Sequence, residues 1–145
     1  MRGQIQFREK LQLTFTLIGA GANGSNFFRG LCHDLRTHLN STSRPKNYYH
    51  DPEPVFRLHQ IMLCDGDLVD EKNLGNQIFE KDEVGTPKVV ALAERYAEHY
   101  DLEVLRYPHY IGDASELSKL VPKIRPQQGI LHLPVLVGLV DNVRP

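Results

Sequence analysis

The segment at residues 19–24 is the first part of the chain whose residue types and spacing could do chemistry. It reads Gly-Ala-Gly-Ala-Asn-Gly, a G-x-G-x-x-G pattern built on Gly19, Gly21 and Gly24. In this pattern the first glycine permits a tight turn, the second lets the backbone approach a phosphate, and the third lets the following helix pack close to the preceding strand. Backbone N–H groups and the helix dipole then favour an anion. The pattern predicts a nucleotide-phosphate site, and a purely structural glycine turn is the alternative.

A carboxylate follows the next apolar run of the chain. Asp65 comes directly after the run Ile-Met-Leu-Cys at 61–64, which is typical of a buried strand. An acid at the end of the second strand of a nucleotide-binding fold can bind the ribose hydroxyls. Asp65 lies about twice as far beyond the glycine pattern as the usual ~20 residues, and the proline-rich stretch at 40–54 accounts for the surplus. Asp65 is therefore a candidate ribose ligand, and a simple turn residue is the alternative.

Further polar residues lie where a strand ends or a helix begins. Lys88 follows Val-Gly-Thr-Pro at 84–87, and Asp141 and Asn142 follow the apolar strand at 134–140. A carboxylate that attacks an α-phosphate meets like charge, so a cation and a metal ion are needed to bring the two together. Magnesium prefers one or two carboxylates together with phosphate oxygens, as Asp141 would supply. The alternatives are that Lys88 is an exposed lysine and that Asp141-Asn142 is an ordinary turn.

Taken in order, these pieces resemble the ThiF/MoeB family of adenylating domains, which are shared with enzymes that activate ubiquitin-like proteins. The family's pattern is a glycine loop, then D-x-D-x-V, N-L-x-R-Q, V-G-x-x-K and a strand that ends in D-N. All five pieces occur here in that order, from about residue 17 to residue 142, with one substitution in the third. Asp65 also precedes Asn73 by eight residues, as it does in the family. The resemblance implies a Rossmann-like domain that binds ATP and Mg²⁺.

The resemblance assigns the nucleotide to residues in the first half of the chain. Gly19, Gly21 and Gly24 would hold the phosphate side of the nucleotide. Asp65 would bind the ribose hydroxyls, with Asp67 beside it as the second acid of the D-x-D motif.

The resemblance also implies roles in the reaction for residues further along the chain. Asn73 and Gln77 would bracket the phosphates. Lys88 would be a catalytic residue that neutralises charge on the phosphates during attack at the α-phosphorus. Asp141 would be the second catalytic residue and the magnesium ligand. Asn142 would contribute to the site by supporting the turn at the strand end.

One nucleotide-binding position departs from the family's pattern. The motif N-L-x-R-Q reads Asn-Leu-Gly-Asn-Gln at 73–77, so Asn76 stands where the family has an arginine. Asparagine replaces neither the charge of the arginine nor its forked contact with phosphates. The loss of such a contact in a transition state reduces the rate on the order of a thousandfold. Arg2 or Arg8 would be the replacement, since a partner subunit in this family can lend an arginine to the site.

An open α/β sheet would bring these residues together. Apolar runs with strand character alternate with helical spacing of apolar residues, which indicates a mostly parallel, Rossmann-like sheet with helices on both faces. Residues 1–145 would form one domain, with a surface loop inserted at 40–54. The expected strands are 11–18, 55–65, 102–110 and 134–140, and the expected helices are 25–39, 86–100 and 113–124.

Capping signals and the last strand refine this picture. Thr86 is expected to cap the second helix with Pro87 at its first position. Asp113 and Glu116 have the spacing of a capping box for the third helix. The strand at 134–140 is nearly all apolar, so we expect it to have neighbours on both edges. Further strands would come from a longer chain, of which this is the N-terminal part, or from a partner chain.

Composition excludes several other classes of protein. The formal net charge of the 145 residues is -1, which argues against a nucleic-acid-binding protein. No apolar run reaches the roughly 18–20 residues that span a bilayer, and the N-terminus lacks the apolar stretch of a secretion signal, so a cytoplasmic protein without membrane contact is expected. Cys32 and Cys64 lie in apolar contexts and should be buried and unreactive. The seven scattered histidines predict no metal site.

The leading interpretation is an ATP-dependent adenylyltransferase domain. It would convert the C-terminal carboxylate of a small ubiquitin-like or sulfur-carrier protein into an acyl-adenylate, and the resemblance implies a homodimer. A nucleotide-binding or scaffolding subunit that has lost adenylation is the second interpretation, favoured by Asn76. An NAD- or FAD-binding oxidoreductase domain is the third, but it leaves Asn73, Lys88 and Asp141 unexplained.

Overall fold

A parallel sheet organises the part of the chain that the structure describes. The computed structural model describes residues 10–38 and 56–140, which form four parallel strands in the order β3-β2-β1-β4. The strands are β1 (Lys10–Ile18), β2 (Phe56–Cys64), β3 (Val104–Tyr107) and β4 (Ile130–Gly138). The helices are α1 (Ala22–His38), α2 (Lys88–Leu92) and α3 (Ala114–Leu120), with 3₁₀ turns η2 (Glu71–Asn73) and η3 (Lys81–Glu83) and a π-helical turn η4 (Ala93–Ala97). The predicted open, Rossmann-like α/β fold is confirmed.

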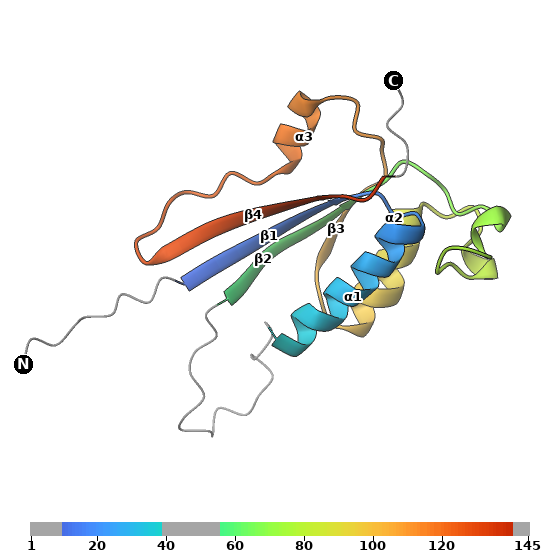
Figure 1. The fold of residues 1–145 in the computed structure, drawn as a ribbon, viewed down its shortest axis with the longest axis horizontal. Helices are drawn as coiled ribbons and strands as arrows, with labels where there is room; N and C mark the ends of the chain where they lie inside the picture. The colour runs from blue at the N-terminus through green and yellow to red at the C-terminus, as the bar shows by residue number, and fades with distance from the viewer. Residues whose placement is uncertain (1–9, 39–55, 141–145) are drawn as a thin grey trace, which may run out of the picture.

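The connections between strands place helices on both sides of the sheet. α1 joins β1 to β2, and α2 with η4 joins β2 to β3; Figure 1 shows α1 and α2 together on one side. α3 lies on the other side, in the return connection from β3 to β4. The chain crosses the sheet in one direction from β1 through β2 to β3 and in the opposite direction from β3 to β4. Right-handed crossovers therefore place the connecting helices on opposite faces of the sheet. The carboxyl ends of the strands therefore meet at one end of the sheet, where α/β proteins bind their ligands.

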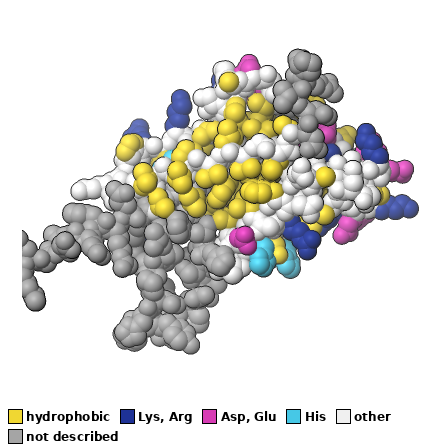
Figure 2. Space-filling view, viewed as in Figure 1, with side chains coloured by type: hydrophobic (Ala, Val, Ile, Leu, Met, Phe, Trp, Pro, Cys, Tyr) yellow, Lys and Arg dark blue, Asp and Glu magenta, His cyan; other side chains and the backbone are white. Residues whose placement is uncertain are grey.

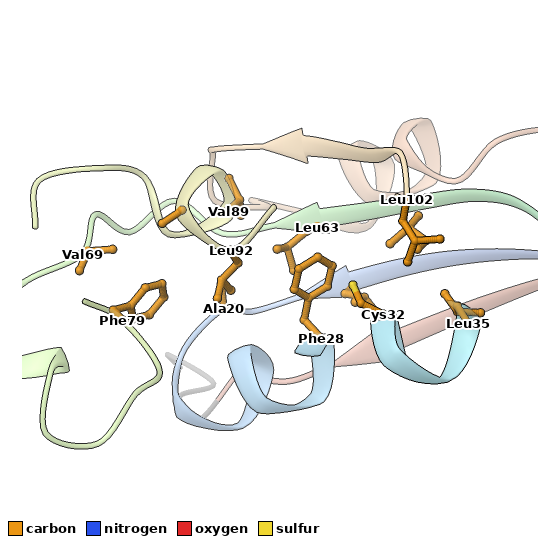
Figure 3. Close-up of a cluster of buried hydrophobic side chains, with 13 residues drawn as sticks. Ala20, Phe28, Cys32, Leu35, Leu63, Val69, Phe79, Val89, Leu92 and Leu102 are labelled. Carbon is orange, nitrogen blue, oxygen red and sulfur yellow. The ribbon is translucent and has the colours of Figure 1, made fainter. Parts of the chain in front are cut away.

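The main core lies between the sheet and α1. Phe28, Cys32 and Leu35 share the face of α1 that the apolar spacing predicts, and they pack with Leu17 of β1 and Leu63 of β2 (Figure 3). All five side chains are buried. Burying a Phe or Leu side chain contributes roughly 1.5–3 kcal/mol. This packing fixes the start of α1 directly above the end of β1.

Within the described residues β4 pairs only with β1 and lies at an edge of the sheet. The sequence-based expectation was that its second neighbour would come from a longer chain or from a partner chain, and this stays a prediction. Leu131, Leu133 and Leu136 of β4 are about half exposed. Figure 2 shows hydrophobic side chains gathered over the strands between α1 and α3. The apolar composition of β4 predicts buried side chains, but within the described residues the side chains of β4 are buried only in part.

Pro134 occupies the open edge of β4. Leu139 donates its N–H to the Ile18 carbonyl oxygen at 2.7 Å. Successive residues of a strand turn their N–H groups to opposite sides, so Pro134, five positions earlier, faces away from β1. Proline has no N–H to donate, and this position removes no hydrogen bond from the β1–β4 ladder.

A buried side-chain contact reinforces the pairing of β1 with β4. The hydroxyl oxygen of Thr14 lies 2.7 Å from Nε2 of His132, and Thr14 is buried. The two strands stay in register over nine residue pairs, from Lys10↔Ile130 to Ile18↔Gly138. β4 is therefore held firmly on its inner edge.

The start of α2 differs from the prediction. The helix begins at Lys88, with Pro87 rather than Thr86 in the N-cap position and without a side-chain cap. The carbonyl oxygen of Thr86 accepts the N–H of Val69 at 2.8 Å, and Pro87 forms a β-bridge with Leu68. This pairing keeps the backbone extended through Pro87, so the predicted Thr86 cap is wrong.

The capping box of α3 forms only in part. Asp113 accepts the N–H of Glu116 at 2.8 Å, as predicted. The Glu116 carboxylate does not complete the box, because it accepts the N–H of Gly112 at 2.8 Å and the hydroxyl of Tyr107. α3 ends at Leu120, short of its predicted end, and buries none of its residues.

Two further expectations can be compared with the structure, and a third cannot. Cys32 and Cys64 are free and buried, as predicted; burial raises the pKa of Cys32 to about 12 and, together with the Asp65 carboxylate, that of Cys64 to about 11. Among the described residues, no helix is both long and apolar enough to cross a membrane. The surface loop predicted at 40–54 lies outside the described residues.

Candidate nucleotide-binding site

The glycine loop joins the end of β1 to the start of α1. Gly19 has a φ of 110°, and a Cβ there would lie 2.7 Å from the carbonyl oxygen of Leu139. A Cβ on Gly24 would lie only 2.0 Å from the carbonyl oxygen of Gly19. Both positions therefore require glycine, the first for its backbone conformation and the second for close approach of α1 to β1. At Gly21 the nearest atom to a Cβ would be Nε2 of Gln77 at 4.0 Å, which leaves the backbone accessible.

Asp65 ties the glycine loop to the end of β2. One carboxylate oxygen accepts the N–H of Ala20 at 2.6 Å, and the other accepts the N–H of Asp67 at 2.8 Å. A carboxylate has about four lone-pair positions, so it can accept two hydroxyl groups in addition. The predicted contact with ribose hydroxyls remains a prediction, and the observed role of Asp65 is to fix the loop.

Lys88 projects from the start of α2 into the same region. Its side chain is buried, and Nζ lies 3.3 Å from a carboxylate oxygen of Asp67. The backbone N–H of Lys88 donates to the Asp67 carbonyl oxygen at 3.0 Å, and Gly85 donates to Val69 at 2.9 Å. These hydrogen bonds hold residues 85–88, at the start of α2, against residues 67–69, which follow β2. The alternative of an exposed lysine at a helix start is wrong.

Tyr110 also contacts Asp67, although no sequence motif identified it. Its hydroxyl donates to the second carboxylate oxygen of Asp67. This hydrogen bond, followed by the charge of Lys88, lowers the pKa of Asp67 against the opposing effect of burial. The position of Tyr110 just after β3 is the signal that could have identified it, because ligands of α/β sheets bind beyond the strand ends.

The predicted phosphate-bracketing residues have different environments. Asn73 is buried, and its side-chain oxygen accepts the N–H of Asp70 at 2.8 Å in the capping box of η2. Gln77 donates its backbone N–H to the Asn73 carbonyl oxygen at 2.9 Å. Oε1 of Gln77 is buried and has no hydrogen-bond partner among the described residues. Asn76 is exposed.

A cleft of about 810 Å³ brings four of the predicted site residues together. Such a volume falls within the range of small-molecule sites, roughly 300–1,000 Å³. Asn76 does not line the cleft. The lining includes the predicted residues Asp67, Asn73, Gln77 and Lys88, together with Gly66, Lys72 and Tyr110.

The remaining predicted residues lie beside the cleft or outside the described part of the chain. Asp65 is adjacent to the lining residue Gly66, and the glycine loop approaches the cleft through Gln77. The predicted metal ligand Asp141 and its neighbour Asn142 lie outside the described residues, as do Arg2 and Arg8. Within the described ranges, no group of three His, Cys, Asp or Glu side chains could hold a metal ion.

The cleft is lined by charged side chains of both signs. Lys72 and Lys88 contribute positive charge, and Lys88 is already desolvated, which strengthens its interaction with an anion. Gln77 also lines the cleft, and its amide nitrogen can donate to a phosphate oxygen, whereas its buried amide oxygen has no hydrogen-bond partner among the described residues. The carboxylates of Asp67, Asp70 and Glu71 make the rest of the lining acidic, so an anionic ligand is best accommodated with a bound cation.

Comparison with known proteins gives a structural likeness. No protein-family model and no curated protein matches the chain. E. coli MccB solved with ATP matches at a TM-score of 0.53 and 19% identity, covering 74% of this chain and 26% of that one. E. coli MccB with AMPCPP and selenomethionine MccA matches at 0.52 and 18%, with coverage of 74% and 25%. The chain shares its fold with MccB.

The likeness covers only part of MccB. A further structure, the microcin C7 biosynthetic enzyme MccB in complex with N-formylated MccA, matches at a TM-score of 0.52 and 19% identity, over 74% of this chain and 25% of MccB. The chain thus spans about a quarter of the length of the MccB structures that it matches.

Proposed function

We propose that the chain is an ATP-dependent adenylyltransferase domain of the ThiF/MoeB type. It activates the C-terminal carboxylate of a small ubiquitin-like or sulfur-carrier protein as an acyl-adenylate. The observation that carries this proposal is the buried ammonium group of Lys88 in a nucleotide-sized cleft beyond β2. The likeness to MccB, which has been solved with ATP and with MccA, supports it.

In the proposed reaction, a carboxylate oxygen of the carrier protein attacks the α-phosphorus of ATP. The bond between the α-phosphorus and the bridging oxygen to the β-phosphate breaks, and pyrophosphate leaves with the electron pair. Lys88 lowers the barrier by neutralising phosphate charge in a desolvated site. Mg²⁺, held by Asp141 according to the family resemblance, would screen the remaining charge on the phosphates. Gln77 and the glycine loop orient the phosphates.

The proposal also includes the assembly. Family resemblance implies a homodimer, and the apolar sequence of β4 suggests a partner chain that completes the sheet. The half-exposed leucines of β4 are consistent with an additional neighbour. In such an assembly Arg2 or Arg8 would supply the charge that Asn76 lacks.

Calorimetric titration of the folded chain tests the nucleotide assignment. Wild type is titrated with ATP and with NAD, each with and without Mg²⁺, beside Lys88→Met. We expect magnesium-dependent ATP binding that Lys88→Met weakens about ten- to hundredfold, because a charge-assisted contact is lost. Lys119→Met, which removes an exposed lysine of α3 outside the cleft, is the matched control and should bind ATP as wild type does. Binding of NAD alone would favour an oxidoreductase domain instead.

A nucleotide-binding subunit that has lost adenylation is the second candidate. Asn76 favours it, since this residue is exposed, lies outside the cleft lining and carries no charge. The two candidates predict the same ATP binding but differ in chemistry. Exchange of labelled pyrophosphate into ATP in the presence of a carrier protein supports adenylation, and binding without exchange supports the degenerate subunit.

A further inference from the structure

Tyr110 is an exposed aromatic residue whose ring is nevertheless held in place. A Cβ on Gly66 would lie 2.6 Å from two atoms of the Tyr110 ring, so the ring packs directly on the Gly66 backbone. The hydroxyl donates to Asp67, and Tyr110 lines the cleft. The residue is still 69% exposed. One part of the ring is therefore anchored while much of its surface remains open to a ligand.

An anchored, open aromatic ring is well suited to stacking. Ring stacking requires a flat surface that keeps its orientation, and a side chain that is already ordered loses little rotamer freedom when the ligand binds. Stacking of one nucleobase on one aromatic side chain contributes about 1–3 kcal/mol as measured by alanine substitution. It is tolerant of base identity, because every base has a π-face.

The order of the strands places Tyr110 at the base end of the proposed nucleotide. The glycine loop follows β1, Asp65 follows β2 and Tyr110 lies just beyond β3, and these three strands are consecutive neighbours in the sheet. Phosphate, ribose and base are also consecutive in a nucleotide. With phosphates at the glycine loop and the ribose at Asp65, the base extends toward the end of β3.

We propose that Tyr110 is the platform on which the nucleobase stacks, an inference that rests on the proposed nucleotide-binding function. Tyr110 then contributes affinity for the base and none for the phosphates. The hydrogen bond from its hydroxyl to Asp67 orients the ring, and the Gly66 backbone supports the face opposite the base.

The test compares ATP with inorganic tripolyphosphate, which has the phosphates but no base. Magnesium-dependent binding of both is measured by calorimetry for wild type, Tyr110→Ala and Tyr110→Phe, after thermal melting has established that each is folded. We expect Tyr110→Ala to weaken ATP binding roughly 5- to 150-fold and to leave tripolyphosphate binding unchanged. Tyr110→Phe keeps the ring and should bind ATP within about threefold of wild type.

A second variant gives a direct optical readout. The chain contains no tryptophan, so Tyr110→Trp introduces a single indole at the proposed platform. ATP should quench its emission, and tripolyphosphate should not.

Several results would overturn the inference. Unchanged ATP affinity in Tyr110→Ala would do so, as would equal losses for ATP and tripolyphosphate, which would mean that Tyr110 acts through Asp67. An emission from Tyr110→Trp that does not respond to bound ATP would also contradict it. Failure of wild type to bind ATP would reject the nucleotide-binding function together with the platform, whereas the other outcomes reject the platform alone.

Discussion

Asp65 and Asp67 are two residues apart, yet the backbone directs their carboxylates to different partners. Asp65 accepts two backbone N–H groups and holds the glycine loop at the end of β2. Asp67 accepts the hydroxyl of Tyr110 and faces the ammonium group of Lys88. The first carboxylate shapes the site, while the second controls the position of its buried cation.

Replacing Asp67 with asparagine removes the charged partner of Lys88 and preserves the shape of the side chain. The pKa of Asp67 is lowered in the folded protein, so its stabilising contribution is fully present above the unfolded value of 3.8 and is lost as the pH falls through the lower folded value. We expect Asp67→Asn to reduce the free energy of unfolding by about 0.5–1 kcal/mol at pH 7, because the Asp67 side chain is 48% exposed and solvent screens its interaction with Lys88. The difference from wild type should shrink below pH 3.8.

Urea unfolding at pH 7 and at a series of acid pH values measures this difference. Asp82→Asn is the control, because Asp82 is an exposed acid of η3 that does not line the cleft. It should leave the stability unchanged. A deficit in Asp67→Asn that stays constant across the acid range would contradict the role given to the ionised carboxylate.

The two buried thiols predict a loss of stability at alkaline pH. Burial raises the pKa of Cys32 to about 12 and of Cys64 to about 11, from 9.0. Their contribution is intact below pH 9 and is lost as the pH rises toward the folded values, because the unfolded thiols ionise first. The free energy of unfolding should fall by up to about 1.4 kcal/mol per pH unit for each thiol. Urea unfolding from pH 8 to 10.5 measures the slope, and a slope that is equally steep in the Cys32→Ala/Cys64→Ala double variant would contradict the prediction.

At the scale of single residues, the motifs identified several residues that line the cleft, but they did not predict the contacts between those residues. Order and spacing identified Asp67, Asn73, Gln77 and Lys88, all of which line the cleft. Tyr110 belongs to no motif, and its place depends on a hydrogen bond to a residue 43 positions earlier. Contacts between distant segments of this kind depend on packing that local patterns do not encode.

Among the elements, α1 depends most directly on a single position. The carbonyl oxygen of Gly19 lies where a methyl group on Gly24 would extend, so any side chain at Gly24 forces α1 away from β1. This displacement would also separate Phe28, Cys32 and Leu35 from the sheet. The third glycine of the pattern thus has a packing role that is independent of any ligand.

We expect Gly24→Ala to lower the free energy of unfolding by about 3 kcal/mol, the upper range for overpacking. Gly30→Ala is the matched control on the same helix, since a Cβ at Gly30 meets nothing within 4 Å. It should stabilise the protein by about 0.5–1 kcal/mol, because alanine favours the helix more than glycine does. Urea unfolding of both variants gives the comparison, and equal effects of the two substitutions would contradict the packing role of Gly24.

Element types were predictable from periodicity, whereas some element boundaries were not. Apolar spacing identified α1 and its buried face, and alternation of strands with helices identified the parallel sheet. The π-helical turn η4 was not predicted. Its residue Arg95 donates to the carbonyl oxygen of Ile78 and to the carboxylate of Glu83, contacts that lie 17 and 12 positions apart along the chain. Interactions over such separations shift boundaries that local sequence alone would place elsewhere.

For the molecule as a whole, the cleft and the open edge lie on different parts of the sheet. The cleft lies beyond the carboxyl ends of β2 and β3, whereas the edge with the half-exposed leucines belongs to β4, at the opposite side of the described sheet. Pro134 interrupts the row of outward N–H groups along that edge, which limits unspecific addition of further strands. A neighbour of the kind proposed above would pair beside the proline or pack on the exposed leucines.

The pairing of β1 with β4 also has a consequence for biosynthesis. Thr14 and His132 are 118 positions apart, and a ribosome adds roughly 5–20 residues per second. β1 is consequently made roughly 6 to 24 seconds before its partner on that side exists. Throughout this interval the central strand has an unsatisfied edge, so the nascent chain is most exposed to misassembly before β4 emerges. Among the four described strands, β4 is therefore the last to be synthesised and the last to find its place beside β1.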